Sequence, residues 1–214
     1  MELLQIVELT TTVVTLALMA SGIPACLKMY RTHSTKNVPF ILFLVSIMNS
    51  VFGLYYGLLV SNSTFVLINV VGVLLWGFYI LTYIGVSRSK SGPLTQVLML
   101  TMMLCGHVIY LRLFAPHPPA LTNTLGLFLF VWSVLLILTP VLDIIHIVQQ
   151  GSSAGSDVPL MVGGSLCCGA WLAYGYLLKD VFIYGPNVLG LGVNSLKLAT
   201  MVAYSGSPAK PKSQ

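Results

Sequence analysis

Apolar residues dominate this chain in long runs that short polar or charged clusters interrupt. Lys28 and Arg31 end the first run, and no Asp, Glu, Lys or Arg occurs between residues 37 and 87. That uncharged stretch is too long for one helix, and its polar residues 61–64 divide it into two. A helix needs about 20 apolar residues to cross a membrane. The pattern therefore predicts seven spanning helices, over about residues 6–27, 38–60, 65–86, 94–114, 122–148, 158–178 and 181–204.

The composition agrees with a protein that lies almost wholly within a membrane. The chain has 214 residues, of which 57% are hydrophobic and only 7% are charged. Soluble domains have about 25% charged residues, so this chain lacks the polar surface that a soluble core would need. We therefore expect a multi-pass protein with short loops.

Lysine and arginine are concentrated in one set of connections. The opposite set holds only Arg112 and Lys179, and cytoplasmic loops are those that carry the excess of these residues. The bias predicts an N-terminus outside and a disordered tail, residues 205–214, in the cytoplasm. The basic residues are scattered, so topology explains the net charge of +5 and no nucleic acid is expected as a partner. The predicted cytoplasmic set is Lys28, Arg31, Lys36, Arg88, Lys90, Lys210 and Lys212.

The residue patterns favour neither an enzyme nor a metal protein. The four cysteines lie inside apolar runs, at positions 26, 105, 167 and 168, without the spacing of zinc ligands. The sequence shows no nucleophile paired with a base and no Gly-rich phosphate loop. We therefore expect no catalytic activity, no metal and no cofactor.

The chain contains an internal duplication. With one offset of 118 residues and no gap, Trp171 falls on Gly53 and Pro140 on Gly22. Three spans followed directly by three more would place the second set upside down in the membrane. The single span between them restores the direction, so the two sets are parallel. We expect a first repeat at 1–86, a linker helix with its loops at 87–119 and a second repeat at 120–204. The identical pairs at this offset are Tyr56 and Tyr174, Gly57 and Gly175, Asn69 and Asn187, and Gly72 and Gly190.

Over essentially its whole length the chain resembles the SWEET family of sugar transporters. Parallel repeats with a substrate site at their interface are a transporter design. The resemblance implies an all-α membrane fold of seven helices, in which two parallel three-helix repeats are joined by a linker helix. The residues that carry the resemblance are Lys28 to Thr35, Tyr56, Gly57, Asn69 to Gly72, Thr139, Pro140, Trp171, Tyr174, Gly175, Lys179, Asp180, Pro186 and Asn187.

Asn69 and Asn187 are the leading candidates for binding substrate. A lone asparagine in a membrane helix would be read as a link between helices. Two copies at equivalent positions of a duplicated unit point toward one central space, and the resemblance implies that both bind the sugar. It also places Trp171 at a substrate-lining position. Gly53, the repeat mate of Trp171, stands where the family commonly has serine, and it enlarges the predicted pocket.

Prolines and glycines form a predicted set of hinges. The resemblance implies a proline that bends each of four helices; Pro140 matches one and Pro159 lies close to a second. In the first repeat Gly22 stands at the helix 1 position with Pro24 two residues on, and Pro39 lies near the helix 2 position. The alternative, that Pro39 and Pro159 merely start helices, stays open at this point.

Two groups of residues are predicted gates. The resemblance implies that Tyr56 and Asp180 close the outer vestibule through a phenol–carboxylate hydrogen bond; for Asp180 alone, the alternative is a solvated turn residue beside Lys179. Asp143 and His146 lie one turn apart and are read as an inner gate or a structural pair, with a proton relay as the alternative.

Two further residues are expected near the membrane surface. A long lysine side chain within a span can extend along the helix until its charge reaches water, so Lys197 is expected to reach toward the cytoplasm. Tryptophan is enriched at membrane interfaces, so Trp132 is expected to face lipid there.

These features together predict a facilitative, bidirectional sugar uniporter that works by alternating access, with monosaccharides and disaccharides as the expected substrates. The expected partners are the sugar, the lipid bilayer and, from the resemblance, a second copy of the chain, in the plasma membrane or the Golgi membrane. The alternatives are a seven-helix receptor and a trafficking adaptor without transport.

Overall fold

The computed structural model describes residues 2–36, 38–154 and 156–205. The tail beyond residue 205, with Lys210 and Lys212, lies outside the described residues, so the predicted disorder there stays a prediction. The described residues form helices joined by short turns: α1 (Glu2–Ala20), α2 (Ile23–Thr32), α3 (Phe40–Leu59), α4 (Ser63–Val86), α5 (Ser91–Phe114), α6 (Pro118–Leu136), α7 (Leu138–Gln150), α8 (Val158–Leu177) and α9 (Val181–Ala203).

All seven predicted spans lie on helices, and two of them are interrupted. Within the described residues, six helical stretches are long and apolar enough to cross a membrane when α1–α2 and α6–α7 each count as one stretch. The seventh, α9, has 23 residues, a length of about 35 Å, but it is less apolar because Asn187, Asn194 and Lys197 lie along it.

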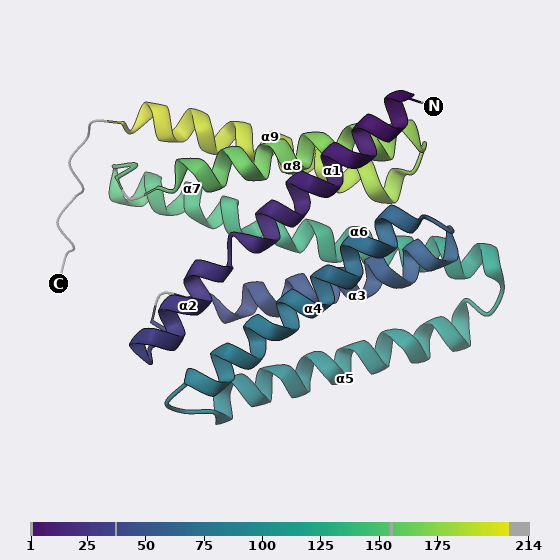
Figure 1. Ribbon diagram of the computed structural model, residues 1–214, viewed down its shortest axis with the longest axis horizontal. Coiled ribbons are helices and arrows are strands. Elements are labelled where there is room, and N and C mark those ends of the chain that lie inside the picture. Colours follow the sequence, from purple (N-terminus) through teal and green to yellow (C-terminus); the bar gives the residue numbers. More distant parts are fainter. Residues whose placement is uncertain (1, 37, 155, 206–214) are drawn as a thin grey trace. The chain divides into compact units, whose positions relative to one another are not determined.

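A proline lies four residues after the point at which the first and fifth spans are each interrupted. Because proline has no backbone N–H, Pro24 leaves the carbonyl of Ala20 without its helical donor, and Pro140 does the same to the carbonyl of Leu136. α1 ends at Ala20 and α6 ends at Leu136, in both cases four residues before the proline. Figure 1 shows the first interruption as a short non-helical connection between α1 and α2.

The duplication extends to the backbone of the turns. Ser61 has φ 53° and Lys179, 118 residues later, has φ 57°. The following residue in each repeat returns its N–H to a glycine carbonyl: Asn62 to Gly57 and Asp180 to Gly175, both at 2.9 Å. Non-glycine residues rarely adopt a positive φ, so a positive φ at equivalent positions of the two repeats indicates one shared turn geometry.

By contacts the described chain divides into two units, which we call the central unit (15–132) and the terminal unit (the described parts of 1–14 and 133–214). In the central unit α4 packs against both α2 and α3, and α3 also packs against α5. In the terminal unit α9 packs against both α7 and α8. The third helix of each predicted repeat therefore lies between the other two.

At two equivalent places, a glycine lets the backbone of a neighbouring helix approach closely. A side chain at Gly57 would meet the backbone nitrogen of Val66 at 3.2 Å, and one at Gly175 would meet that of Tyr184 at 2.6 Å. Since a neighbouring backbone cannot move aside as a side chain can, these glycines are required for α3 to pack on α4 and for α8 to pack on α9.

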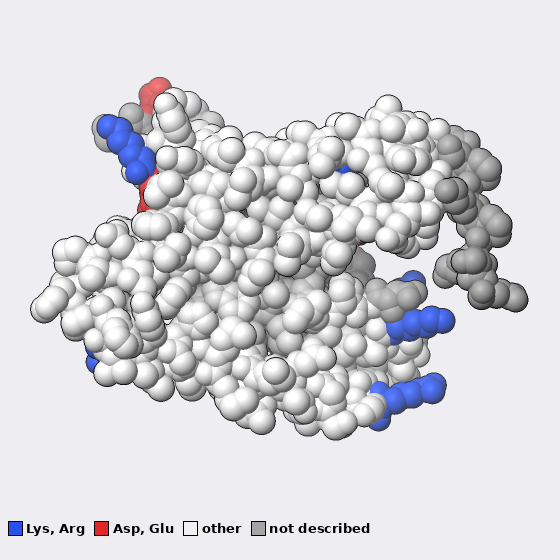
Figure 2. Space-filling model, turned by 180° about the vertical axis from the view of Figure 1, so that it is seen from behind, with Lys and Arg blue, Asp and Glu red and all other residues white. Residues whose placement is uncertain are grey.

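The exposed surface carries the apolar residues that a lipid environment requires. Leu74, Leu81 and Phe114 are each more than half exposed. On the face shown in Figure 2, charged side chains gather in a few groups, and most of the surface between them is uncharged.

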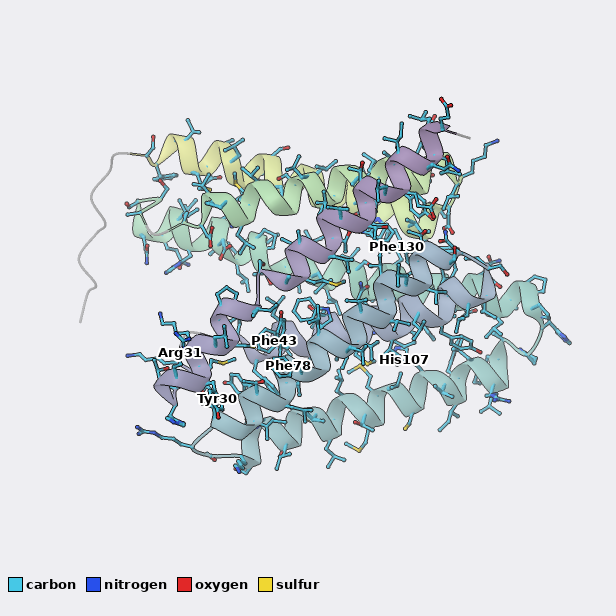
Figure 3. The ribbon with its side chains drawn as sticks, viewed as in Figure 1. Tyr30, Arg31, Phe43, Phe78, His107 and Phe130 are labelled. Carbon is cyan, nitrogen blue, oxygen red and sulfur yellow. The ribbon has the colours of Figure 1, made fainter. Side chains whose placement is uncertain are left out.

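Trp132 is buried in the central unit, so the expectation that it faces lipid is wrong. Its side chain is 6% exposed, and its ring stacks at 6.4 Å from the ring of Phe52. His107, labelled on α5 in Figure 3, lies at 5.1 Å from Phe52 and at 4.6 Å from Phe128. Stacking and edge contacts between these rings favour a buried position for Trp132 over an interfacial one.

We predict that Gly175→Ala destabilises the protein, whereas Gly169→Ala on the same helix does not. The added methyl group at position 175 meets a backbone nitrogen, while at position 169 no atom lies within 4 Å of it. Overpacking of this kind costs about 1–3 kcal/mol, and alanine at an open helical site gains up to about 1 kcal/mol. Thermal unfolding of the detergent-purified variants measures the difference. Equal midpoints for the two variants would contradict the prediction.

Candidate functional site

The two predicted binding asparagines have the same local geometry. Asn69 on α4 donates its Nδ2–H to the carbonyl of Phe65 at 2.8 Å, and Asn187 on α9 donates to the carbonyl of Ile183 at 2.7 Å. Each carbonyl belongs to the residue four positions earlier. The bond to its own helix fixes one end of each amide, and each amide has a second N–H and an oxygen for other partners.

The start of each helix determines the depth of its asparagine. Asn62 caps α4 by accepting a bond from Phe65 N at 2.9 Å, and Asp180 caps α9 by accepting one from Phe182 N at 3.0 Å. Each asparagine follows its capping residue by seven positions, which is about 10 Å along a helix. The duplicated caps therefore place both amides at the same height on their helices.

Gly53 lies directly beneath the amide of Asn69. A side chain at this glycine would meet the Asn69 amide, with Cγ at 2.7 Å and Nδ2 at 2.8 Å. Asn69 is 6% exposed, so its amide has little space to move away. The sequence predicted only that Gly53 enlarges a pocket. The structure adds that Gly53 makes room for the observed orientation of Asn69.

Trp171 takes the place of Gly53 in the terminal unit. The tryptophan is half-buried on α8, and its ring lies at 5.8 Å and 71° from the ring of Tyr174. Asn69 and Gly53 belong to the central unit, whereas Asn187 and Trp171 belong to the terminal unit. The convergence of these four residues on one cavity stays a prediction.

The predicted hinge residues occupy two kinds of position. Gly22, Pro24 and Pro140 lie at the interruptions of the first and fifth spans. Pro39 is the residue before α3, and Pro159 is in the first turn of α8, where proline is well accommodated because no helical N–H is needed. Gly22, Pro24 and Pro140 therefore mark interruptions of helices, whereas Pro39 and Pro159 mark helix starts. Movement at any of these residues stays a prediction.

The residues of the predicted outer gate have clear structural contacts of their own. Tyr56 is 3% exposed on α3, with its ring at 6.2 Å from that of Phe65. Asp180 uses its carboxylate as the cap of α9. Because these two residues belong to different units, a hydrogen bond between them stays a prediction.

An ion pair that the sequence did not predict joins α7 and α9. Lys197 Nζ lies 2.6 Å from Asp143 Oδ2, and the lysine side chain is 10% exposed. The expectation that the charge of Lys197 reaches water is therefore wrong, since the charge is paired inside the terminal unit. His146 instead contacts Gln150, with their Nε2 atoms 2.7 Å apart. The sequence does contain a signal for this ion pair, because Asp143 and Lys197 are opposite charges in two spans that are otherwise uncharged.

A pocket of about 600 Å³ lies elsewhere in the central unit, and its lining includes Tyr55, Arg112 and Leu121. None of the predicted site residues belongs to its lining. Among the described residues, no three His, Cys, Asp or Glu side chains come together as metal ligands would.

Comparison with known families gives a match at both halves of the chain. The family described as "Sugar efflux transporter for intercellular exchange" matches residues 5–91 and, again, residues 123–209. The chain belongs to this SWEET family. The two matched segments start 118 residues apart, the offset found from the four identical pairs, so the duplication is confirmed. A transporter family is not a class of enzymes, and the chain is a multi-pass membrane protein.

Similar proteins span most of the chain. The "Sugar transporter SWEET1" of Mus musculus is 32% identical over 190 residues, which are 89% of this chain and 86% of that protein. The protein of the same name from Homo sapiens is 31% identical over 179 residues, 84% of this chain and 81% of that protein. A solved structure of a eukaryotic SWEET transporter superposes with a TM-score of 0.82 at 23% identity, over 94% of this chain and 96% of that one. This likeness confirms the predicted arrangement of three helices, one linker helix and three helices.

We predict that Asp180→Asn preserves the stability of the protein, whereas Asp180→Ala lowers it. The amide oxygen of asparagine can accept the bond from Phe182 N, as Asn62 does for Phe65 N in the other repeat. Loss of an N-cap costs about 1 kcal/mol, which is about 2–4 °C in the unfolding midpoint of a chain of this size. Thermal unfolding in detergent measures both variants. A destabilised Asp180→Asn would show that the charge, not the cap, stabilises this turn.

Proposed function

We propose that this protein is a facilitative, bidirectional uniporter of monosaccharides and disaccharides that works by alternating access. The observation that carries the proposal is the pair of asparagines, which have matching helix positions and matching local hydrogen bonds. Membership of a family of sugar transporters supports the substrate class. The relatives named above are sugar transporters, which supports the same conclusion.

The chemistry of the four proposed binding residues suits a sugar. A carboxamide has two N–H donors and an acceptor oxygen, and a sugar hydroxyl both donates and accepts. With one N–H bonded to its own helix, each asparagine can offer the remaining donor and the oxygen to hydroxyl groups. Trp171 supplies an aromatic face for the apolar C–H face of the sugar ring. We propose that Gly53 keeps the opposite side open and holds the Asn69 amide in position.

The proline interruptions supply the flexibility that alternating access needs. A helix with a missing backbone bond bends more easily than a continuous one. We propose that the segments on either side of these interruptions tilt as the cavity opens first to one side of the membrane and then to the other. Tyr56 and Asp180 would close the outer side, and Asp143 would act at the inner side.

We propose transport down the sugar gradient without a coupled ion. Lys197, the charged residue that is buried among the described residues, is balanced by Asp143, so the pair contributes no net charge. A site with millimolar affinity holds only about 4 kcal/mol, enough to orient a sugar and still release it. We further propose an N-terminus outside and a C-terminus in the cytoplasm, in the plasma membrane or the Golgi membrane.

We predict that Asn69→Ala and Asn187→Ala each abolish sugar uptake. Removal of either amide leaves hydroxyl groups of the bound sugar without partners in a site that excludes water, a loss of about 1–3 kcal/mol for each group. Uptake of radiolabelled glucose, fructose, galactose and sucrose into proteoliposomes measures the effect, with and without a proton gradient.

The matched control for this experiment is Asn123→Ala. This asparagine is exposed on α6, and its removal should leave uptake unchanged. Uptake that survives substitution of both Asn69 and Asn187 would exclude the proposed site. A wild-type protein that shows ligand-stimulated signalling and no flux would favour a receptor.

We predict that Gly53→Ala impairs uptake mainly through its effect on the Asn69 amide. The new methyl group would occupy the space of that amide and force it from its present orientation. Gly77→Ala is the control, since its methyl group meets only Ile47, at 3.9 Å. We expect a higher KM for Gly53→Ala and an unchanged KM for Gly77→Ala. If Gly53→Ala transports with an unchanged KM, the position of Asn69 is not critical.

A further inference from the structure

The ion pair between Asp143 and Lys197 lies at a position where the two repeats carry different residues. At the offset of 118 residues, Lys197 of α9 corresponds to Tyr79 of α4. Both residues are buried, Tyr79 with 0% exposure and Lys197 with 8%. Each lies on the third helix of its repeat, ten residues beyond the binding asparagine that we propose.

In the central unit this position makes a neutral contact with the first span. Tyr79 donates its hydroxyl hydrogen to the carbonyl of Met19 at 3.0 Å. Its ring also lies against Gly22, where a side chain would meet Tyr79 Cε2 at 2.7 Å. The tyrosine thus links α4 to the last turn of α1, immediately before the interruption at Ser21 and Gly22.

In the terminal unit the same position makes an ionic contact. Lys197 donates to Asp143 at 2.6 Å, and Asp143 follows Pro140 by three residues. The lysine therefore links α9 to α7, six residues after the interruption at Ile137. In each repeat the third helix contacts the interrupted span. The contact comes before the break in the first repeat and after it in the second.

The two partners of the ion pair differ in how deeply they are buried. The side chain of Lys197 is 10% exposed, whereas that of Asp143 is 49% exposed. An ammonium group that loses its partner in a buried position is left without compensation, while a half-exposed carboxylate is less strongly desolvated. Neutralising Asp143 should therefore harm the protein more than neutralising Lys197.

We propose that Asp143 and Lys197 are positioning residues for transport, which fix α7 to α9 so that both helices move together about the break at Ile137. This inference rests on the proposed transport function. The pair lies about 15 Å along α9 from Asn187, and the amide of Asn187 is held by its own helix. Loss of the pair should therefore slow the conformational change and leave the affinity for sugar unchanged.

The test compares the maximal rate and the KM of sugar uptake, each normalised to folded protein in the membrane. We expect Asp143→Asn to lower the maximal rate about tenfold and Lys197→Met about threefold, with KM within about twofold of wild type in both. The double variant should lose less than the product of the two single losses, because it leaves no unpaired charge. Lys197→Arg, which keeps the charge, should retain most of the rate.

The control is Lys90→Met, which removes an exposed lysine from the turn before α5 and should transport as wild type does. A merely structural role for the pair would lower the amount of folded protein and leave the rate per folded molecule unchanged, which would overturn the inference. Independent effects of the two substitutions, or a raised KM with an unchanged maximal rate, would also overturn it. A wild-type protein without sugar flux would instead overturn the proposed function itself, and the inference with it.

Discussion

Within a membrane, a backbone carbonyl that loses its helical donor finds no water to replace it, and this constraint organises both halves of the protein. Pro24 and Pro140 each remove one such donor, and the first and fifth spans are interrupted four residues earlier. A residue of the third helix contacts each interrupted span: Tyr79 at Met19, in the last turn before the first break, and Lys197 at Asp143, six residues after the second. Each interrupted span thus has a side-chain contact to the third helix of its own repeat.

The two halves share their backbone more closely than their side chains. The turns before α4 and α9 repeat the same positive φ angle and the same return bond to a glycine carbonyl. Asn69 and Asn187 keep the same bond to their own helices. By contrast, Gly53 corresponds to Trp171. Features that fix the height and spacing of helices have been kept, while side chains that determine the shape and charge of the interior have diverged.

The sequence predicted the elements and the duplication well because both depend on signals along the chain. Apolar length locates a span, and an offset of 118 residues needs only matching letters. What it did not predict was which side of each helix faces its neighbours. Trp132 was assigned to the lipid interface, and Lys197 was assigned to the membrane surface, yet both are buried. On a helix that is apolar all round, hydrophobicity does not distinguish the packed face from the lipid face. The contact of Tyr79 with Met19 escaped prediction for the same reason.

The buried lysine of α9 has a consequence for the biogenesis of the protein. A lysine costs about 3 kcal/mol for insertion at the centre of a helix and less toward its ends, and Lys197 lies in the last third of α9, which is less apolar than the other spans. The carboxylate that offsets this charge is on α7, which is synthesised earlier. Pairing with α7 therefore lowers the cost of keeping the charge of α9 in the bilayer, whereas α4 carries no charge and needs no such partner.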